Sequence, residues 1–298
     1  VGLRSDTVKT DAGSIVNRGA GTVADQNAFD SRSRGFTDNN WDFAAQAKYT
    51  ADAASGYEIA FARKTRSPNL MERYLWSPAN ASAGMADGKT YIGNLDLKPE
   101  VSHQVSLGAD WRGAGWQVKP SLFYNKVNDY IQGVAGIYSA TVLKYTNIDA
   151  ELYGMDGSWR YDVTNNLGLS GIVSYVRGKR TDVSDNLYRL APLRASINAD
   201  YAMGQWNHRA EWQLAARQDK VSANNSETAT GGYGLFNLRT SYRFDKKATL
   251  NAGIENLFDR YYADHLGGVN RVSGSVVASG EHLPGAGRFG YVSADYRW

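Results

Sequence analysis

The sequence predicts an all-β protein, an antiparallel transmembrane β-barrel of which about twelve strands are present. Three observations support this fold class: side chains alternate between apolar and polar, the alternating segments are long, and short turns alternate with long loops. The stretch VSHQVSLGADW, residues 101–111, shows the alternation, because one register is apolar except for His103 and the other register is polar. Successive side chains of a strand point to opposite faces, so we predict a strand with two unlike faces here.

The same alternation recurs along the chain, for instance in WDFAAQAKY (41–49) and LRASINADY (193–201). We expect strands at 1–9, 39–51, 56–66, 98–112, 115–130, 141–162, 166–180, 187–202, 205–219, 232–244, 247–257 and 286–298. Many are longer than the usual soluble strand of about 5–6 residues. They suit a tilted crossing of a bilayer, which needs roughly 9–11 residues.

The connections between these strands alternate in length. Short turns are expected at 52–55, 113–114, 163–165, 203–204 and 245–246. Longer polar loops are expected at 10–38, 67–97, 131–140, 181–186, 220–231 and 258–285. Outer-membrane barrels have short periplasmic turns and long extracellular loops, so we expect this location and this orientation.

Aromatic side chains gather on the apolar face beside the short turns. They are Tyr49, Tyr57, Trp111, Trp116, Tyr161, Tyr201, Trp206, Tyr242, Tyr296 and Trp298. Assigning strands by alternation does not require this placement, but an aromatic girdle at one membrane interface does. The apolar face is therefore predicted to contact outer-membrane lipid, with His103 and His208 on that face near the turns. A soluble β-sandwich or a lipocalin-like barrel is the alternative, with the apolar face turned inward.

The opposite, polar face carries charges of both signs. They are Arg194, Asp200, Arg209, Glu211, Arg217, Arg239, Arg243, Glu255 and Asp295. We expect these side chains to face the lumen of the barrel. Mixed signs favour a surface that contacts a plug, although a water-filled pore would also have charged walls.

Composition narrows the function classes. The chain of 298 residues has 33 basic and 30 acidic residues and a net charge of +3, which indicates no nucleic-acid partner. It has no cysteine and no apolar run of about 18 residues, so disulfides and a transmembrane helix are not expected. The four histidines form no HExxH pattern, and no GxSxG or phosphate-binding glycine loop is present. We therefore expect neither an enzyme nor a cofactor.

Several motifs resemble those of TonB-dependent outer-membrane receptors. NLDLKPEVSHQVSLGADW (94–111) resembles a strand start of that family, and FARKTRSPNLMERY (61–74) resembles the strand end before it. AGIENLFDRYY (252–262) resembles the penultimate-strand signature, and LPGAGRFGYVSADYRW (283–298) resembles the last strand. Asn147, Glu151 and Gly154 resemble another strand start with a structural role. Four motifs in the family's order are more specific than any one of them.

The resemblance implies a receptor that captures a scarce metal ion or a metal chelate at the cell surface. Energy would come from the inner membrane through the TonB complex, which contacts a plug domain inside a barrel of about 22 strands. Residues 1–298 would then be the C-terminal portion of the barrel, with the plug and the first strands absent. The alternatives are a passive pore of about twelve strands and, less favoured, an adhesin or an enzyme barrel.

The ligand-site candidates lie in the long loops. Within the family, YYADHLGGVNRV (261–272) and the 67–97 loop resemble the copper-receptor subgroup, although iron-siderophore receptors share the same scaffold. Met71, Met85, His265 and His282 could bind a soft metal ion, because Cu(I) favours thioether and imidazole ligands. The alternative is that these four side chains only pack the loops together.

Overall fold

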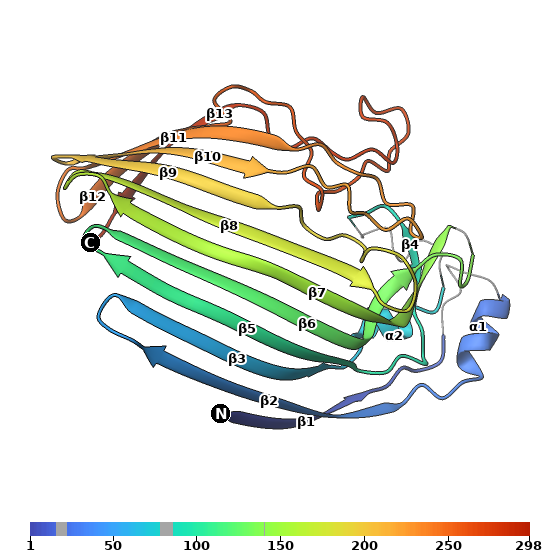
Figure 1. The fold of residues 1–298 in the computed structure, drawn as a ribbon. Helices are drawn as coiled ribbons and strands as arrows, with labels where there is room; N and C mark the ends of the chain where they lie inside the picture. Colours follow the sequence, from blue (N-terminus) through green and yellow to red (C-terminus); the bar gives the residue numbers. More distant parts are fainter. Residues whose placement is uncertain (16–22, 78–85, 140) are drawn as a thin grey trace.

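The computed structural model describes residues 1–15, 23–77, 86–139 and 141–298. Twelve of its strands form one antiparallel meander in which each strand pairs with its neighbours along the chain (Figure 1). They are β1 (Gly2–Thr10), β2 (Phe36–Thr50), β3 (Ser55–Arg66), β5 (Glu100–Gly113), β6 (Trp116–Val134), β7 (Val142–Asp162), β8 (Leu167–Arg180), β9 (Arg194–Met203), β10 (Trp206–Ala215), β11 (Tyr233–Arg243), β12 (Ala248–Glu255) and β13 (Phe289–Tyr296). The predicted all-β, antiparallel class is confirmed.

Three short elements lie inside predicted loops and were not expected from the sequence. They are α1 (Val23–Asp30), α2 (Leu70–Tyr74) and β4 (Thr90–Ile92). β4 pairs in parallel with β7, off the main order of the sheet. Neither helix of the described chain has the length and apolar character of a membrane span.

The prediction of a strand over 187–202 was wrong at its beginning, since β9 begins only at Arg194. Leu187 is fully buried and packs under Gly178, and Arg189 has a left-handed φ of 59° that a strand excludes. The predicted strand over 205–219 was also too long. β10 ends at Ala215, so Arg217 lies beyond the strand.

The two edge strands, β1 and β13, each pair with only one neighbour among the described residues. The sheet is curved but does not close on itself (Figure 1). A closed barrel of these twelve strands, which the pore alternative requires, is therefore not the arrangement observed.

One face of the sheet exposes a continuous layer of apolar side chains, which we call the apolar face. Ile59, Leu107 and Leu122 stand directly opposite one another on β3, β5 and β6. They are 51%, 51% and 52% exposed, respectively. Soluble monomers seldom expose apolar patches of more than a few hundred Å². This face therefore matches the predicted lipid surface and does not match the core of a sandwich or a lipocalin-like barrel.

The predicted girdle residues lie at the short-turn end of the apolar face. Tyr49 is 67% exposed, Trp116 is 42% exposed and Tyr201 is 43% exposed. Trp111, Trp206, Tyr242 and Tyr296 occupy the same end of their strands, and Trp298 follows β13. His208 follows Trp206 closely, as expected, but His103 does not lie near a turn: it stands ten positions before Gly113, at the other end of β5. Contact of the girdle with a membrane interface stays a prediction.

The buried core lies at the long-loop end of the sheet. One cluster joins Tyr91 of β4 with Leu97, Ile131, Leu143 and Tyr145. A second cluster joins Val134, Ile148, Ala150 and Leu187. The long loops therefore fold onto the extended ends of β6 and β7 and form a compact cap there.

Several residues of the sequence motifs join neighbouring segments through ion pairs or hydrogen bonds. Arg66 binds Glu72 at 2.9 Å and Glu100 at 2.7 Å, which joins the end of β3 to α2 and to β5. Glu72 also closes a capping box with Asn69 at the start of α2. Asn256, buried and at a φ of 49°, holds the turn after β12 by bonding the backbone of Arg260.

Candidate functional site

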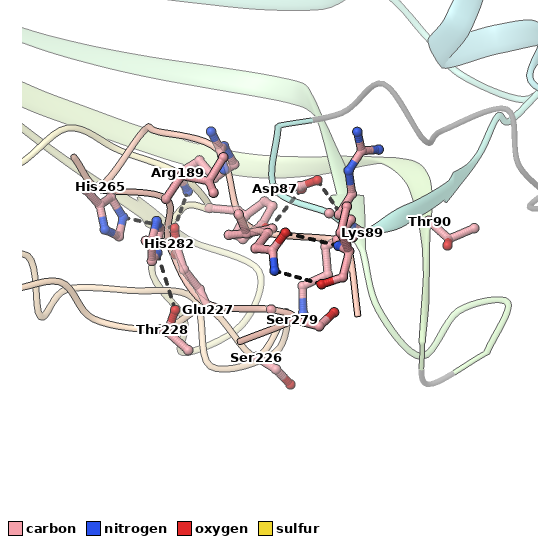
Figure 2. Close-up of a pocket in the computed structure, with 18 residues that line it drawn as sticks. Asp87, Lys89, Thr90, Arg189, Ser226, Glu227, Thr228, His265, Ser279 and His282 are labelled. Atoms are coloured by element: carbon pink, nitrogen blue, oxygen red, sulfur yellow. Dashed lines mark hydrogen bonds and ion pairs between the residues drawn. The ribbon is translucent and has the colours of Figure 1, made fainter. Parts of the chain in front are cut away.

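A polar cavity of about 850 Å³ lies among the long loops. Figure 2 shows that its side chains come from segments far apart in the sequence. Lining residues lie in 87–90, 188–189, 226–228, 265–272 and 279–283. Ligand sites of proteins occupy cavities of roughly 300–1,000 Å³, so the volume suits a small molecule or chelate.

Backbone pairing holds these loops around the cavity. The Val269 N–H donates to the Ala86 carbonyl at 2.9 Å, and Val269 also forms an antiparallel bridge with His282. Gly88 faces this junction with a φ of +68°, and a Cβ there would meet the Val269 side chain at 2.5 Å. Both the backbone conformation and the close approach therefore require glycine at position 88.

His265 is buried and fully bonded. Its Nε2 lies 3.1 Å from Glu227 Oε1, and its Nδ1 lies 3.1 Å from Thr230 Oγ1. Glu227 also accepts the backbone N–H groups of Arg189 and Ser222, at 2.9 and 2.8 Å. His265 and Glu227 thus connect three loops, and neither ring nitrogen is available for a ligand without breaking a hydrogen bond.

His282 is less constrained. Its ring centroid lies 6.0 Å from that of His265, and its Nε2 makes only a long contact of 3.5 Å to Thr228 (Figure 2). Its Nδ1 is buried and has no hydrogen-bond partner among the described residues. Burial, together with the charges of His265 and Arg189, lowers the pKa of His282, so its ring is neutral at pH 7.

Asp87 anchors the opposite side of the cavity. Its carboxylate accepts hydrogen bonds from the hydroxyl groups of Tyr91 and Tyr188 and from the Lys89 backbone N–H, the last at 3.0 Å. Burial and the bond to this carboxylate raise the pKa of Tyr91, so Tyr91 stays protonated. Asp87 therefore holds its loop in place and offers few free lone pairs to a ligand.

The basic groups of the cavity are more available than its acids. Among the described residues, no carboxylate lies within ion-pair distance of Lys89 or Arg271. Arg189 donates to the Leu266 carbonyl at 2.8 Å and is the third cation of the lining. The lining contains three cations, Lys89, Arg189 and Arg271, and two carboxylates, Asp87 and Glu227, so its formal charge is +1.

A preformed metal site is not visible in this cavity. No group of three or more His, Asp or Glu side chains among the described residues could hold a metal ion. Met71 lies in α2, is 45% exposed and does not line the cavity, and Met85 lies outside the described residues. Of the three predicted ligand candidates among the described residues, the structure therefore brings together His265 and His282 and leaves Met71 apart.

The predicted lumen-facing charges share one face of the sheet. Arg209 stands opposite Asp200 and binds it at 2.6 Å, and Arg239 binds Glu255 at 2.7 Å and Glu211 at 2.9 Å. Alternation places Arg243 and Asp295 on the same face, and Arg217 follows in the same register beyond β10. Arg194 differs from the rest, because it binds Asp264 of the last long loop at 2.7 Å. The lumen and plug contacts of these residues stay predictions.

The sequence interpretation missed most of the cavity lining. Asp87, Lys89, Arg189, Glu227 and Arg271 had no distinguishing pattern, because each is an isolated charge in a polar loop. The weak signal was that His265 and His282 share one loop.

Comparison with known proteins gives a match to the family model described as TonB dependent receptor-like, beta-barrel, over residues 1–257. The ferric enterobactin receptor PirA of Pseudomonas aeruginosa is 23% identical over 248 residues, covering 74% of this chain and 33% of the relative. The ferrienterobactin receptor of Escherichia coli is 22% identical over 287 residues, covering 87% of this chain and 37% of the relative. The chain thus spans about a third of the length of these curated relatives.

Solved structures show the same fold. The copper transporter OprC superposes with a TM-score of 0.76 at 23% identity, covering 89% of this chain and 40% of that protein. The ferric enterobactin receptor PfeA of Pseudomonas aeruginosa superposes with a TM-score of 0.66 at 21% identity, covering 87% of this chain and 40% of that protein. The motifs, the twelve-stranded meander and the match over residues 1–257 agree, and the chain belongs to the TonB-dependent receptor β-barrel family.

Proposed function

We propose that this chain is part of an outer-membrane receptor that takes up an anionic metal chelate, with extracellular long loops and periplasmic short turns. The observation that carries the proposal is the positively charged cavity of about 850 Å³ enclosed by the long loops of a TonB-dependent receptor barrel. In the intact protein, capture in this cavity precedes movement of a plug that is coupled to the TonB complex.

The charge and size of the cavity favour a chelate over a bare metal ion. Lys89, Arg189 and Arg271 supply ammonium and guanidinium donors, which suit the oxygen anions of a metal–siderophore complex. A metal ion would need three or more converging ligands, and the described residues contain no such group of His, Asp or Glu side chains. The relatives named as ferric enterobactin receptors are consistent with this ligand class.

Copper is the second candidate, and one observation favours it. His282 Nδ1 is buried without a partner beside His265, so the imidazole pair could supply two ligands if Glu227 released His265. Imidazole suits copper ions. Additional ligands would then have to come from outside the described cavity.

The test is an uptake measurement with the full-length protein in an outer membrane that lacks its own receptors. Radiolabelled ferric enterobactin and copper ions serve as separate probes, each with and without a protonophore. Energy-dependent uptake of the ferric chelate supports the proposal. Energy-dependent uptake of copper alone would replace it with the second candidate, and uptake insensitive to the protonophore would support a passive pore instead.

Charge reversal connects the result to the cavity. K89E with R271E should reduce chelate binding about thirtyfold or more, because each cation near an anion contributes roughly 1 kcal/mol even at the dielectric constant of water. K98E is the matched control, since Lys98 is an exposed loop cation outside the cavity lining. Equal binding by the double variant and the control would remove the cavity from the proposal.

A further inference from the structure

On β3 to β8 the charged side chains of the apolar face gather near one level. From the aromatic girdle toward the long loops, this face of β3, β5, β6, β7 and β8 presents uncharged side chains over a length of about seven residues. Charged and titratable groups then appear together. They are Arg63, His103, Lys126, Glu151, Arg177 and Lys179, with Asp149 one position higher on this face of β7. We call the four cations and His103 the basic row.

The strand register aligns these residues across the sheet. Arg63 stands opposite His103, His103 opposite Lys126, Lys126 opposite Glu151, and Glu151 opposite Lys179. Neighbouring strands are about 4.8 Å apart, so the row extends about 19 Å from β3 to β8. On the same face of β9 to β13 the only titratable side chain inside a strand, apart from tyrosines, is His208, which lies at the girdle end.

The height of the row matches a membrane boundary. Lys126 lies ten positions after Trp116, and His103 lies ten positions before Gly113. Ten residues at about 3.3 Å each, on a strand tilted by about 40°, rise about 25 Å. This equals the height of the apolar band of outer-membrane barrels, about 25 Å. The row therefore lies at the far edge of the band whose near edge is the aromatic girdle.

The cations of the row are poorly neutralised by protein groups. Among the described residues, no carboxylate lies within ion-pair distance of the Lys126 or Lys179 ammonium groups, although Glu151 stands between them. Glu151 instead accepts the Tyr124 hydroxyl at 3.2 Å. A charge at the edge of an apolar band without a protein partner calls for a partner from the membrane.

The two ends of the row are held by neutral groups. The Arg63 guanidinium lies 3.6 Å from the Trp41 ring centroid and donates to the Trp41 carbonyl. Arg177 Nη2 donates to Asn186 at 2.9 Å, while its Nη1 is buried and has no partner among the described residues. Both guanidinium groups thus keep their full charge and are held in defined positions beside the lysines.

We propose that the basic row binds phosphate groups of lipids in the leaflet on the long-loop side. Arg63, His103 and Lys126 form one anion site, and Arg177 and Lys179 form a second, with β7 between them. Phosphate oxygens accept charge-assisted hydrogen bonds from ammonium and guanidinium donors. That this leaflet is the outer one rests on the orientation in the proposed function, whereas the lipid site itself does not.

The experiment measures lipid retention by native mass spectrometry of the full-length protein in detergent. The probes are phosphatidic acid, phosphatidylcholine and inorganic phosphate, each at equal concentration. We expect selective retention of phosphatidic acid that weakens as salt increases. The K126Q/K179Q variant should lose about thirtyfold in affinity, because each lysine near an anionic lipid surface contributes about fivefold. K126R/K179R should restore retention, which separates loss of charge from misfolding.

The matched control is K64Q/K119Q, which removes two lysines from β3 and β6 on the opposite face, where they pair with Asp42 and Asp110. Equal retention of the two lipids, or equal loss in the variant and the control, would overturn the proposal. Phosphatidic acid displaced by an equal concentration of inorganic phosphate would also overturn it, because the site would then take a free anion. Selective lipid retention with no chelate uptake would leave this proposal intact and refute only the proposed function.

Discussion

Removal of the Glu227 carboxylate should open the cavity. Glu227 Oε1 bonds His265 and the Arg189 N–H, and Oε2 bonds the Ser222 N–H. The E227A variant leaves two backbone donors and one imidazole without their acceptor in a place where the Glu227 side chain is only 7% exposed. An unsatisfied buried donor costs about 1–3 kcal/mol, so the two amides alone destabilise the local structure by about 2–6 kcal/mol. We expect the loops after β8, β10 and β12 to separate without loss of the sheet.

Hydrogen–deuterium exchange of the full-length protein tests this prediction. Amide protection in 219–231 and 264–270 should fall by one to four orders of magnitude in E227A, while the strands keep their protection. E281A is the control, because Glu281 lies in the same group of loops and its exposed side chain makes none of these bonds. If the amides of these loops are as protected in E227A as in the wild type, Glu227 does not hold the three loops together and the reasoning is refuted.

Three further predictions concern pH, the membrane and the methionine. Burial lowers the pKa of His282 below its unfolded value of about 6.5, so the open state of the loops binds the proton more tightly than the closed state. Amide protection of the loops should therefore be highest above pH 6.5 and fall as the pH decreases below it. In H282Q this protection should depend less on pH. Lipid-phase quenchers should quench Trp111, Trp116 and Trp206 at interface depth, and complete shielding of all three would show that the apolar face is turned inward. M71L should leave copper and chelate uptake unchanged, because Met71 does not line the cavity; a loss of copper uptake alone would contradict this.

Most of the sheet could be predicted because, in a strand with two unlike faces, apolar and polar side chains alternate with a period of two residues. The prediction worked where one face is uniformly apolar, as from Trp116 to Tyr124. It was wrong over 187–193, where Leu187, Leu190 and Leu193 recur every third residue and the alternation seen in 193–201 does not continue. Leu187 is buried under the cap and Arg189 has a left-handed φ, so this segment is a loop that packs against the cap.

The candidate site was predictable only in part. His265 and His282 could be selected because histidine is rare in this chain and both lie in one loop. Glu227 is 38 residues away from His265 in sequence, and Asp87 is 101 residues away from its partner Tyr188. Contacts between separate loops depend on the packing of the cap, for which a single sequence contains no periodic signal.

The unpaired edges of the sheet restrict how a barrel can include it. Neighbours in the meander are antiparallel, so β1 runs toward the long loops and β13 runs toward the short turns. Strands inserted between these two edges must alternate in direction and still meet both edges in antiparallel fashion, which only an even number can do. Any closed, fully antiparallel barrel that contains this sheet therefore has an even total of strands, whatever its circumference.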